Sequence, residues 1–297
     1  MQPTIRSHQS FITTNYAKIW YQICDTATSQ NQIPIICING GPGLTHDSLL
    51  TLKTLANNHP VIFYDQSGCG KTTTKNPDFN NWTLDYFTNE LESFIAALGY
   101  KQVHIIGHSW GGMLAVQYAL KNPTKIASLI LIGPCLSSSM WIDDCKKLAE
   151  SVSPKLYNTM LIHETNQTTD SSEYAEAINE FYSNFFCRTL PWPKDLENAM
   201  SLINRKIYET MWGCSETSAT GNLKDIDLVP NLHLINHPTL FICGQYDPAT
   251  PESMHFCASK MKNAKVTVIE NCAHCVPFEK PTELITAINT FYINLNS

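Results

Sequence analysis

Gly107-His108-Ser109-Trp110-Gly111-Gly112 lies between a short apolar run, residues 103–106, and a segment of helical character, residues 113–120. A Gly-x-Ser-x-Gly pattern at a strand-to-helix turn is typical of the nucleophile elbow, which holds serine in an unfavourable backbone conformation. The flanking glycines leave room for the chain to fold back on itself. Such a turn presents the serine hydroxyl at the N-terminal end of a helix, which stabilises developing negative charge. We therefore expect Ser109 to be a nucleophile; the alternative is an ordinary glycine-rich turn.

A serine nucleophile needs a base and an orienting carboxylate, and the sequence has a candidate for each. Asp247 follows the apolar run at residues 239–243, and His274 follows the one at residues 265–270. Because loops after parallel strands meet at one edge of a sheet, we expect both side chains near Ser109. The order Ser, Asp, His is that of the triad built on this type of elbow. His274 is thus the expected general base, and Asp247 the residue that holds its imidazole.

Acyl transfer also requires hydrogen-bond donors for the oxyanion of the tetrahedral intermediate. Asn39-Gly40-Gly41-Pro42-Gly43 follows the apolar run at residues 34–38. In enzymes with this elbow, that loop supplies one backbone N–H, and the residue after the nucleophile supplies the other. We expect these donors to be Gly41 and Trp110. The alternative is a Gly/Pro turn that binds no ligand.

The arrangement of apolar runs indicates the fold class. Runs at residues 34–38, 61–64, 103–106 and 126–132 are nearly continuous, as in strands buried on both faces of a parallel sheet. A helical pattern covers residues 83–98, and an antiparallel hairpin is expected at residues 12–24. Alternating strands and helices predict an α/β protein, here an α/β-hydrolase fold with a mostly parallel central sheet flanked by helices.

A helical insertion is expected within this fold. From residue 136 to residue 236 the strand pattern gives way to helical and polar segments, and the next buried strand begins only at residue 239. The sequence therefore predicts a core of residues 1–135 and 237–297 with a helical cap, residues 136–236, inserted in it. Acidic residues gather in this cap, since residues 137–222 contain twelve Asp or Glu and seven Lys or Arg. They either attract a cationic substrate or form a solvated acidic surface.

Composition and charge restrict the partners and the compartment. The formal charge of −6, with no Lys/Arg stripe, argues against binding to nucleic acid. Residues 1–16 lack the features of an export signal, and no apolar run approaches the roughly 18 residues of a membrane span. Eleven scattered cysteines are typical of reduced thiols, so a cytoplasmic location is expected. The chemistry expected of the triad requires no metal and no organic cofactor.

The sequence resembles the proline iminopeptidase family of α/β-hydrolases, including its amino-acid amidase relatives. Its segments are similar to the family patterns His-Gly-Gly-Pro-Gly, Asp-Gln-x-Gly-x-Gly and Gly-x-Ser-Trp/Tyr-Gly-Gly, and the likeness extends over nearly the whole chain. The matching segments are Asn39-Gly40-Gly41-Pro42-Gly43, Asp65-Gln66-Ser67-Gly68-Cys69-Gly70, Gly107 to Gly112, residues 211–216 and residues 244–251.

The resemblance implies an activity and a further binding residue. It implies release of an N-terminal residue, often proline, from a small peptide or amino-acid amide that has a free amino terminus. In this family acidic residues bind the substrate ammonium, and Glu216 matches a position that does so. A carboxylate facing an amine in a cleft has a Coulomb rationale. The alternative for Glu216 is an ordinary surface residue of the cap.

Two departures from the family pattern keep other functions open. Asn39 replaces the usual His, which matters little because the expected oxyanion donor is a backbone group. Pro248 stands where the peptidases often have a second glutamate for the amine. An amino-acid amidase or a carboxylesterase with the same triad is therefore an alternative to the aminopeptidase. A ligand-binding protein that keeps the fold without turnover is a further alternative.

Overall fold

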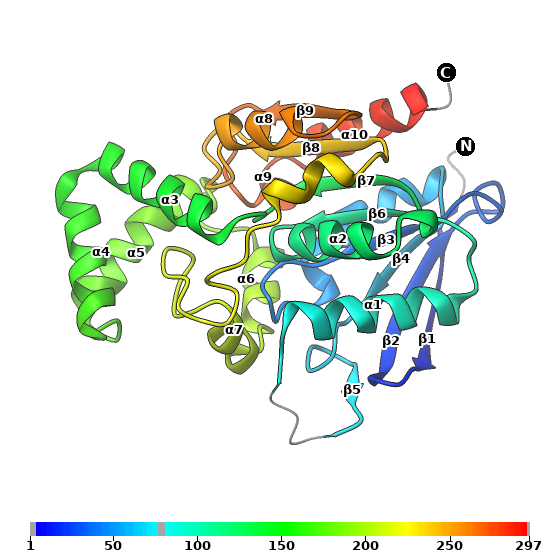
Figure 1. The fold of residues 1–297 in the computed structure, drawn as a ribbon, viewed down its shortest axis with the longest axis horizontal. Coiled ribbons are helices and arrows are strands. Elements are labelled where there is room, and N and C mark those ends of the chain that lie inside the picture. The colour runs from blue at the N-terminus through cyan, green and yellow to red at the C-terminus, as the bar shows by residue number, and fades with distance from the viewer. Residues whose placement is uncertain (1–3, 77–80, 296–297) are drawn as a thin grey trace.

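The computed structural model describes residues 4–76 and 81–295 and is built around one twisted sheet (Figure 1). The sheet order is β1-β2-β4-β3-β6-β7-β8-β9, with the short β5 paired to β2. The strands are β1 (Arg6–Thr13), β2 (Ala17–Asp25), β3 (Ile35–Ile38), β4 (Val61–Tyr64), β5 (Thr73–Thr74), β6 (Val103–His108), β7 (Ile126–Ile132), β8 (Thr239–Gly244) and β9 (Ala264–Ile269). From β4 onward neighbouring strands are parallel, and β2 pairs antiparallel with its neighbours. The predicted mostly parallel sheet is confirmed.

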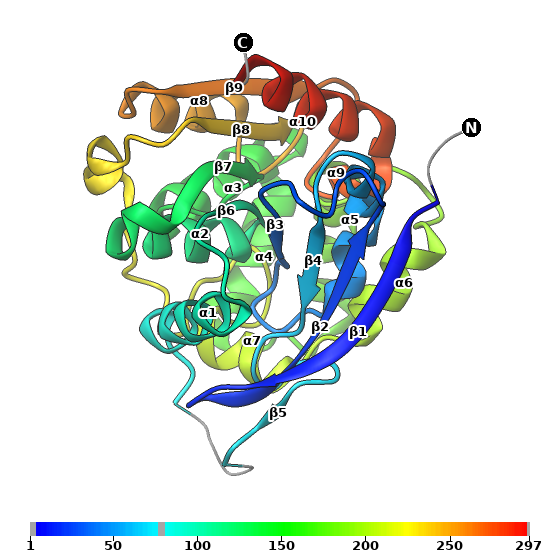
Figure 2. The same cartoon turned by 90° about the vertical axis from the view of Figure 1, so that its right-hand side faces the viewer.

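Helices cover both faces of this sheet, which explains why its strands are continuously apolar. Consecutive side chains of a strand point to opposite faces. In β3, Ile36 and Ile38 join one core cluster, whereas Ile35 and Cys37 join the other. The first cluster packs under α1, α2 and α8, and the second under η1 and α10 (Figure 2). These helices are α1 (Leu84–Leu98), α2 (Trp110–Lys121), α8 (Pro251–Ser259), the 3-10 helix η1 (His46–Asn57) and α10 (Pro281–Leu295); η2 (Pro123–Lys125) and α9 (Val276–Glu279) are short.

Helix α1 shows how the local sequence sets the ends of an element. Thr83 precedes it in an extended conformation, and its Oγ1 accepts a hydrogen bond from the N–H of Tyr86 at 3.1 Å. At the other end Gly99 adopts φ +78°, the left-handed conformation that closes many helices. The helix predicted at residues 83–98 is confirmed within one residue.

A run of helices separates β7 from β8 in the chain. They are α3 (Ser138–Val152), α4 (Pro154–Asn166), α5 (Ser172–Phe185), α6 (Lys194–Ser201), α7 (Arg205–Met211) and η3 (Val229–Leu234). In Figure 1, α3, α4 and α5 project beyond the sheet. The division into a core of residues 1–135 and 237–297 and a cap of residues 136–236, here called the insertion, is a proposal. Within that division, residues 1–3, 77–80 and 296–297 lie outside the described part of the chain.

Three further features of the described residues concern membrane spans, metal sites and the state of the cysteines. None of the helices in residues 4–76 and 81–295 combines the length and apolar character needed to cross a bilayer. In the same part of the chain, His, Cys, Asp and Glu side chains form no group of three that could hold a metal ion. The eleven cysteines are free thiols, ten of them buried.

Candidate active site

Ser109 lies at the tight turn between β6 and α2. Its backbone has φ +55° and ψ −119°, a conformation that L-residues rarely adopt. The two flanking glycines make the turn possible. A Cβ on Gly107 would lie 2.3 Å from the carbonyl oxygen of Gly111, and a Cβ on Gly111 would lie 2.2 Å from that of Ile38. The start of α2 thus packs directly on β6 and on the end of β3, which places Ser109 at the carboxyl edge of the sheet.

Asp247 and His274 form a buried pair at the same edge. Asp247 follows β8 and His274 follows β9, and His274 Nδ1 lies 2.8 Å from Asp247 Oδ1. Their exposed fractions are 0% and 2%. The N–H of Ala249 also donates to Asp247 Oδ1, at 2.8 Å. The carboxylate therefore has a fixed orientation and directs one nitrogen of the imidazole toward itself, leaving Nε2 for another partner.

Opposing effects act on the pKa of His274. Burial, the largest effect, lowers this pKa because it disfavours the charged ring. The charge and hydrogen bond of Asp247 raise it, and Glu216 and Glu279 add to that effect, so that the pKa is raised above its ordinary value. The site thus strengthens the imidazole as a base and stabilises the imidazolium that forms when it accepts a proton.

The His274 ring has a hydrogen-bond partner on its Asp247 side and none on its Ser109 side among the described residues. Catalytic hydrogen bonds are often long before substrate binds. Proton transfer from Ser109 would require a hydrogen bond to His274 to form in the substrate complex.

His108, next to Ser109, supports the backbone of His274. Burial lowers the pKa of His108 to about 3, and the nearby His274 contributes in the same direction, so the ring is neutral. Its Nε2 lies 3.2 Å from the carbonyl oxygen of His274, which can only accept a hydrogen bond. His108 therefore donates through Nε2, and Nδ1 carries no proton.

Two backbone N–H groups are available beside Ser109. Trp110 is the first residue of α2, and Gly41 lies in the loop between β3 and η1, here called the oxyanion loop (residues 39–45). In the described part of the chain, no hydrogen bond uses the N–H of either residue. Both residues line one cavity together with Ser109. Unpaired donors at this position could receive an oxyanion.

This cavity has apolar walls and a single acidic side chain. The insertion supplies Trp141 and Trp212, whose ring centroids are 6.3 Å apart and nearly perpendicular, and Trp141 also packs edge-on against His274. The lining residues are Gly41, Pro42, Ser109, Trp110, Met113, Cys135, Trp141, Trp212, Glu216 and Leu223. The lining can therefore offer apolar contacts and one carboxylate to a bound group.

Glu216 is held in place from both its backbone and its side chain. Its carbonyl oxygen accepts a hydrogen bond from Trp141 Nε1 at 2.8 Å, and its Oε1 accepts one from the Tyr208 hydroxyl at 2.8 Å. Burial raises the pKa of Glu216, while the nearby His274 acts in the opposite direction. An incoming ammonium would lower this pKa again, because an opposite charge favours the ionised carboxylate.

Comparisons with known proteins identify the family of the chain. The family model described as the alpha/beta hydrolase fold matches residues 33–281. A proline iminopeptidase of Heyndrickxia coagulans is 39% identical over 284 residues, which is 95% of this chain and 98% of that protein. This chain belongs to the proline iminopeptidase family of α/β-hydrolases. The resemblance and the α/β-hydrolase fold predicted from the sequence are both confirmed.

Solved structures of related proteins share the whole architecture of this family member. The crystal structure of proline iminopeptidase from Mycobacterium smegmatis superposes with a TM-score of 0.88 at 28% identity and covers 96% of this chain and 97% of that one. The crystal structure of a protein named VinJ also superposes with a TM-score of 0.88, at 30% identity. The match covers 98% of this chain and 99% of that one.

In this proline iminopeptidase family member, the insertion also holds the loop that carries His274. The N–H of His274 donates to the carbonyl oxygen of Phe185 at 3.1 Å, and Phe185 ends α5. Glu279 Oε1 accepts from the N–H of Ala273 at 2.9 Å, and its Oε2 accepts from the N–H of Arg188 at 2.7 Å. Sequence reasoning missed Glu279, because nothing in its surroundings distinguishes it from an ordinary residue in the first turn of a helix.

Proposed function

We propose that this chain is a serine aminopeptidase that releases an N-terminal proline, or another small apolar residue, from short peptides. Membership of the proline iminopeptidase family supports the proposal. The observation that carries it is the cavity beside Ser109, which Glu216 and two tryptophan rings line together with Gly41 and Trp110, whose N–H groups are unpaired among the described residues. There the protonated nitrogen of an N-terminal proline would lie near a carboxylate, and its ring would contact apolar walls.

The proposed reaction proceeds through an acyl-enzyme. His274 takes the proton of Ser109 as Oγ attacks the carbonyl carbon of the first residue, and Asp247 holds the imidazole. The N–H groups of Gly41 and Trp110 stabilise the oxyanion. When the intermediate collapses, the C–N bond breaks and the imidazolium gives its proton to the leaving amine. Water, deprotonated by His274, then attacks the ester. The C–O bond to Ser109 breaks, the imidazolium returns the proton to Ser109 Oγ, and the free amino acid leaves.

The position of Glu216 accounts for release of a single residue. Glu216 and Ser109 line the same small cavity, so an ammonium at the carboxylate and a carbonyl at the hydroxyl belong to one residue. A peptide without a free amine would leave the buried carboxylate without a cationic partner, which is costly. The site thus selects for both the terminal position and the charge of the substrate.

Replacing Glu216 by glutamine tests the ammonium-binding role. For a proline arylamide, kcat/KM is expected to fall roughly 10- to 100-fold, because a hydrogen bond to a charged group contributes about 1.5–3 kcal/mol. For the cyclopentanecarboxylic arylamide, in which CH₂ replaces the ring nitrogen, kcat/KM is expected to change by less than about threefold. Steady-state kinetics with both substrates measures the difference.

The control variant is Glu209→Gln, which removes the same charge from an exposed position on α7. This variant should leave kcat/KM unchanged for both substrates. Equal losses for the two substrates in Glu216→Gln would remove the ammonium-binding role. A wild-type preference for uncharged aryl esters would favour a carboxylesterase instead, and a Ser109 that fails to react with a fluorophosphonate would favour a ligand-binding protein without turnover.

An amino-acid amidase is the second candidate, and one observation favours it. Pro248, and not an acidic residue, follows Asp247, and Glu216 is the single carboxylate among the residues that line the cavity. A site with one carboxylate attracts a substrate ammonium less strongly than a site with two, which departs from the pattern of the peptidases. Comparing prolinamide with prolyl dipeptides distinguishes the two, since an amidase would hydrolyse the amide with the higher kcat/KM.

A cytoplasmic location is part of the same proposal. Reduced thiols support it, because the eleven cysteines are free and ten of them are buried. Fractionation of cells with antibody detection of the native chain tests the location, and recovery outside the cytoplasmic fraction would refute it.

A further inference from the structure

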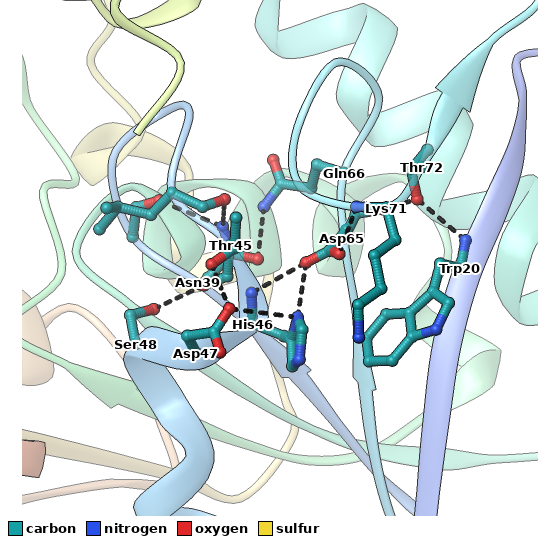
Figure 3. A network of polar contacts seen from close by, with 12 residues as sticks. Trp20, Asn39, Thr45, His46, Asp47, Ser48, Asp65, Gln66, Lys71 and Thr72 are labelled. Atoms are coloured by element: carbon teal, nitrogen blue, oxygen red, sulfur yellow. Dashed lines mark hydrogen bonds and ion pairs between the residues drawn. The ribbon is translucent and has the colours of Figure 1, made fainter. Parts of the chain in front are cut away.

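A continuous set of buried hydrogen bonds joins the nucleophile elbow to the oxyanion loop. Trp110 Nε1 donates to Gln66 Oε1 at 3.0 Å, and Gln66 Nε2 donates to Asn39 Oδ1 at 3.4 Å. Asn39 Nδ2 then donates to the carbonyl oxygen of Leu44 at 2.6 Å. The side chains of Gln66 and Asn39 face each other in Figure 3. The exposed fractions of Trp110, Gln66 and Asn39 are 2%, 1% and 0%.

The chemistry of these groups allows one direction of donation through the set. An indole N–H can only donate, so Gln66 must turn its oxygen toward Trp110. Its NH₂ group then faces Asn39, whose oxygen accepts and whose own NH₂ group reaches the Leu44 carbonyl oxygen. Any other orientation of either amide would bury a donor or acceptor without a partner. Gln66 is therefore held in one conformation between two loops.

The turn that carries Gln66 is itself fixed to the oxyanion loop. Asp65 Oδ1 accepts from the backbone N–H of His46 at 3.0 Å and lies 2.8 Å from His46 Nδ1. Its Oδ2 accepts from the N–H of Lys71 at 2.9 Å, which closes the turn after β4 (Figure 3). Asp65 is fully buried. The oxyanion loop is thus held at its start through Asn39, and His46, the first residue after the loop, is held as well, in both cases by the Asp65-Gln66 pair.

We infer that Gln66 is a positioning residue that sets the separation of the two oxyanion donors. The inference rests on the proposed function. The donors belong to Gly41, on the oxyanion loop, and Trp110, at the start of α2, which are remote in sequence. The oxyanion requires each donor within about 2.7–3.1 Å. Gln66 hydrogen-bonds one loop through Trp110 and the other through Asn39, so its amide fixes the gap between them. Its effect is expected on the transition state, because Gln66 is not among the residues that line the cavity.

Replacing Gln66 by methionine tests this inference, because methionine has a similar length and no hydrogen-bonding amide. For a proline arylamide, kcat is expected to fall roughly 10- to 100-fold with KM nearly unchanged, since misplaced oxyanion donors weaken binding of the transition state alone. The Ki of L-prolinal, whose aldehyde forms a tetrahedral adduct with a serine nucleophile, should rise by the same factor as kcat/KM falls. The Ki of proline should not change.

Two further variants separate positioning from folding. Gln22→Met removes another buried amide, on β2, where it bonds Ser7, and should leave kcat and both Ki values unchanged. Asn39→Asp interrupts the same set of hydrogen bonds at Leu44 and should repeat the selective effect on kcat and on L-prolinal. If thermal unfolding shows that Gln66→Met does not fold, Asn39→Asp tests the positioning role in its place.

The outcomes distinguish this inference from the proposed function. If the wild type hydrolyses the arylamide and binds L-prolinal, and the folded Gln66→Met or Asn39→Asp protein does both equally well, the inference is wrong and the function stands. Equal weakening of proline and L-prolinal would also overturn it, because the network would then support the substrate cavity. A wild type that neither hydrolyses nor binds these probes overturns the function, and the inference falls with it.

Discussion

Replacement of Ser109 by alanine is expected to lower kcat for a proline arylamide by on the order of 10⁶-fold, because the acyl-enzyme can no longer form. The fold should persist. Ser109 Oγ forms no hydrogen bond among the described residues, so its removal leaves no buried group without a partner. Steady-state kinetics, thermal unfolding and mass spectrometry after treatment with a fluorophosphonate measure the three consequences.

The control for this variant is Ser201→Ala, which removes an exposed hydroxyl at the end of α6. It should keep wild-type turnover and the fluorophosphonate adduct. If Ser109→Ala retained more than about a thousandth of the wild-type kcat, well above what the rest of a triad site supplies, another group would have to be the nucleophile.

The approximate positions of the candidate catalytic residues could be predicted because each depends on a local pattern. A buried strand can be recognised from its apolar run, and the residue just after a parallel strand lies at the carboxyl edge of the sheet. For this reason Ser109, Asp247 and His274 could be placed near one another before any coordinates, although their roles remain proposals.

The supporting contacts could not be predicted, because they join residues whose proximity depends on the whole fold. Gln66 is 44 positions from Trp110 and 27 from Asn39. No spacing rule links an amide after β4 to an indole at the start of α2. The cavity raises the same difficulty, since Trp141 and Glu216 reach it from separate parts of the insertion. Helical periodicity predicts which face of such a segment is buried. It does not predict how the segment is oriented over the core.

Replacement of Asp247 by asparagine is expected to have the second largest effect, a fall in kcat of about 10⁴-fold, because an amide no longer selects the tautomer that leaves His274 Nε2 free to accept a proton. The structural change is small, since asparagine matches aspartate in size. Kinetics across a range of pH and thermal unfolding measure the effect.

The pH profile of the same variant separates electrostatics from geometry. Turnover requires neutral His274, so kcat/KM of the wild type falls as the pH drops through the pKa of His274. Asp247 raises that pKa, and without it burial, which lowers the pKa, becomes dominant. The acidic limb of Asp247→Asn should therefore move to lower pH, whereas Asp225→Asn, at an exposed position of the insertion, should keep the wild-type profile. An Asp247→Asn protein with an unshifted limb and near-normal kcat would mean that another group orients the imidazole.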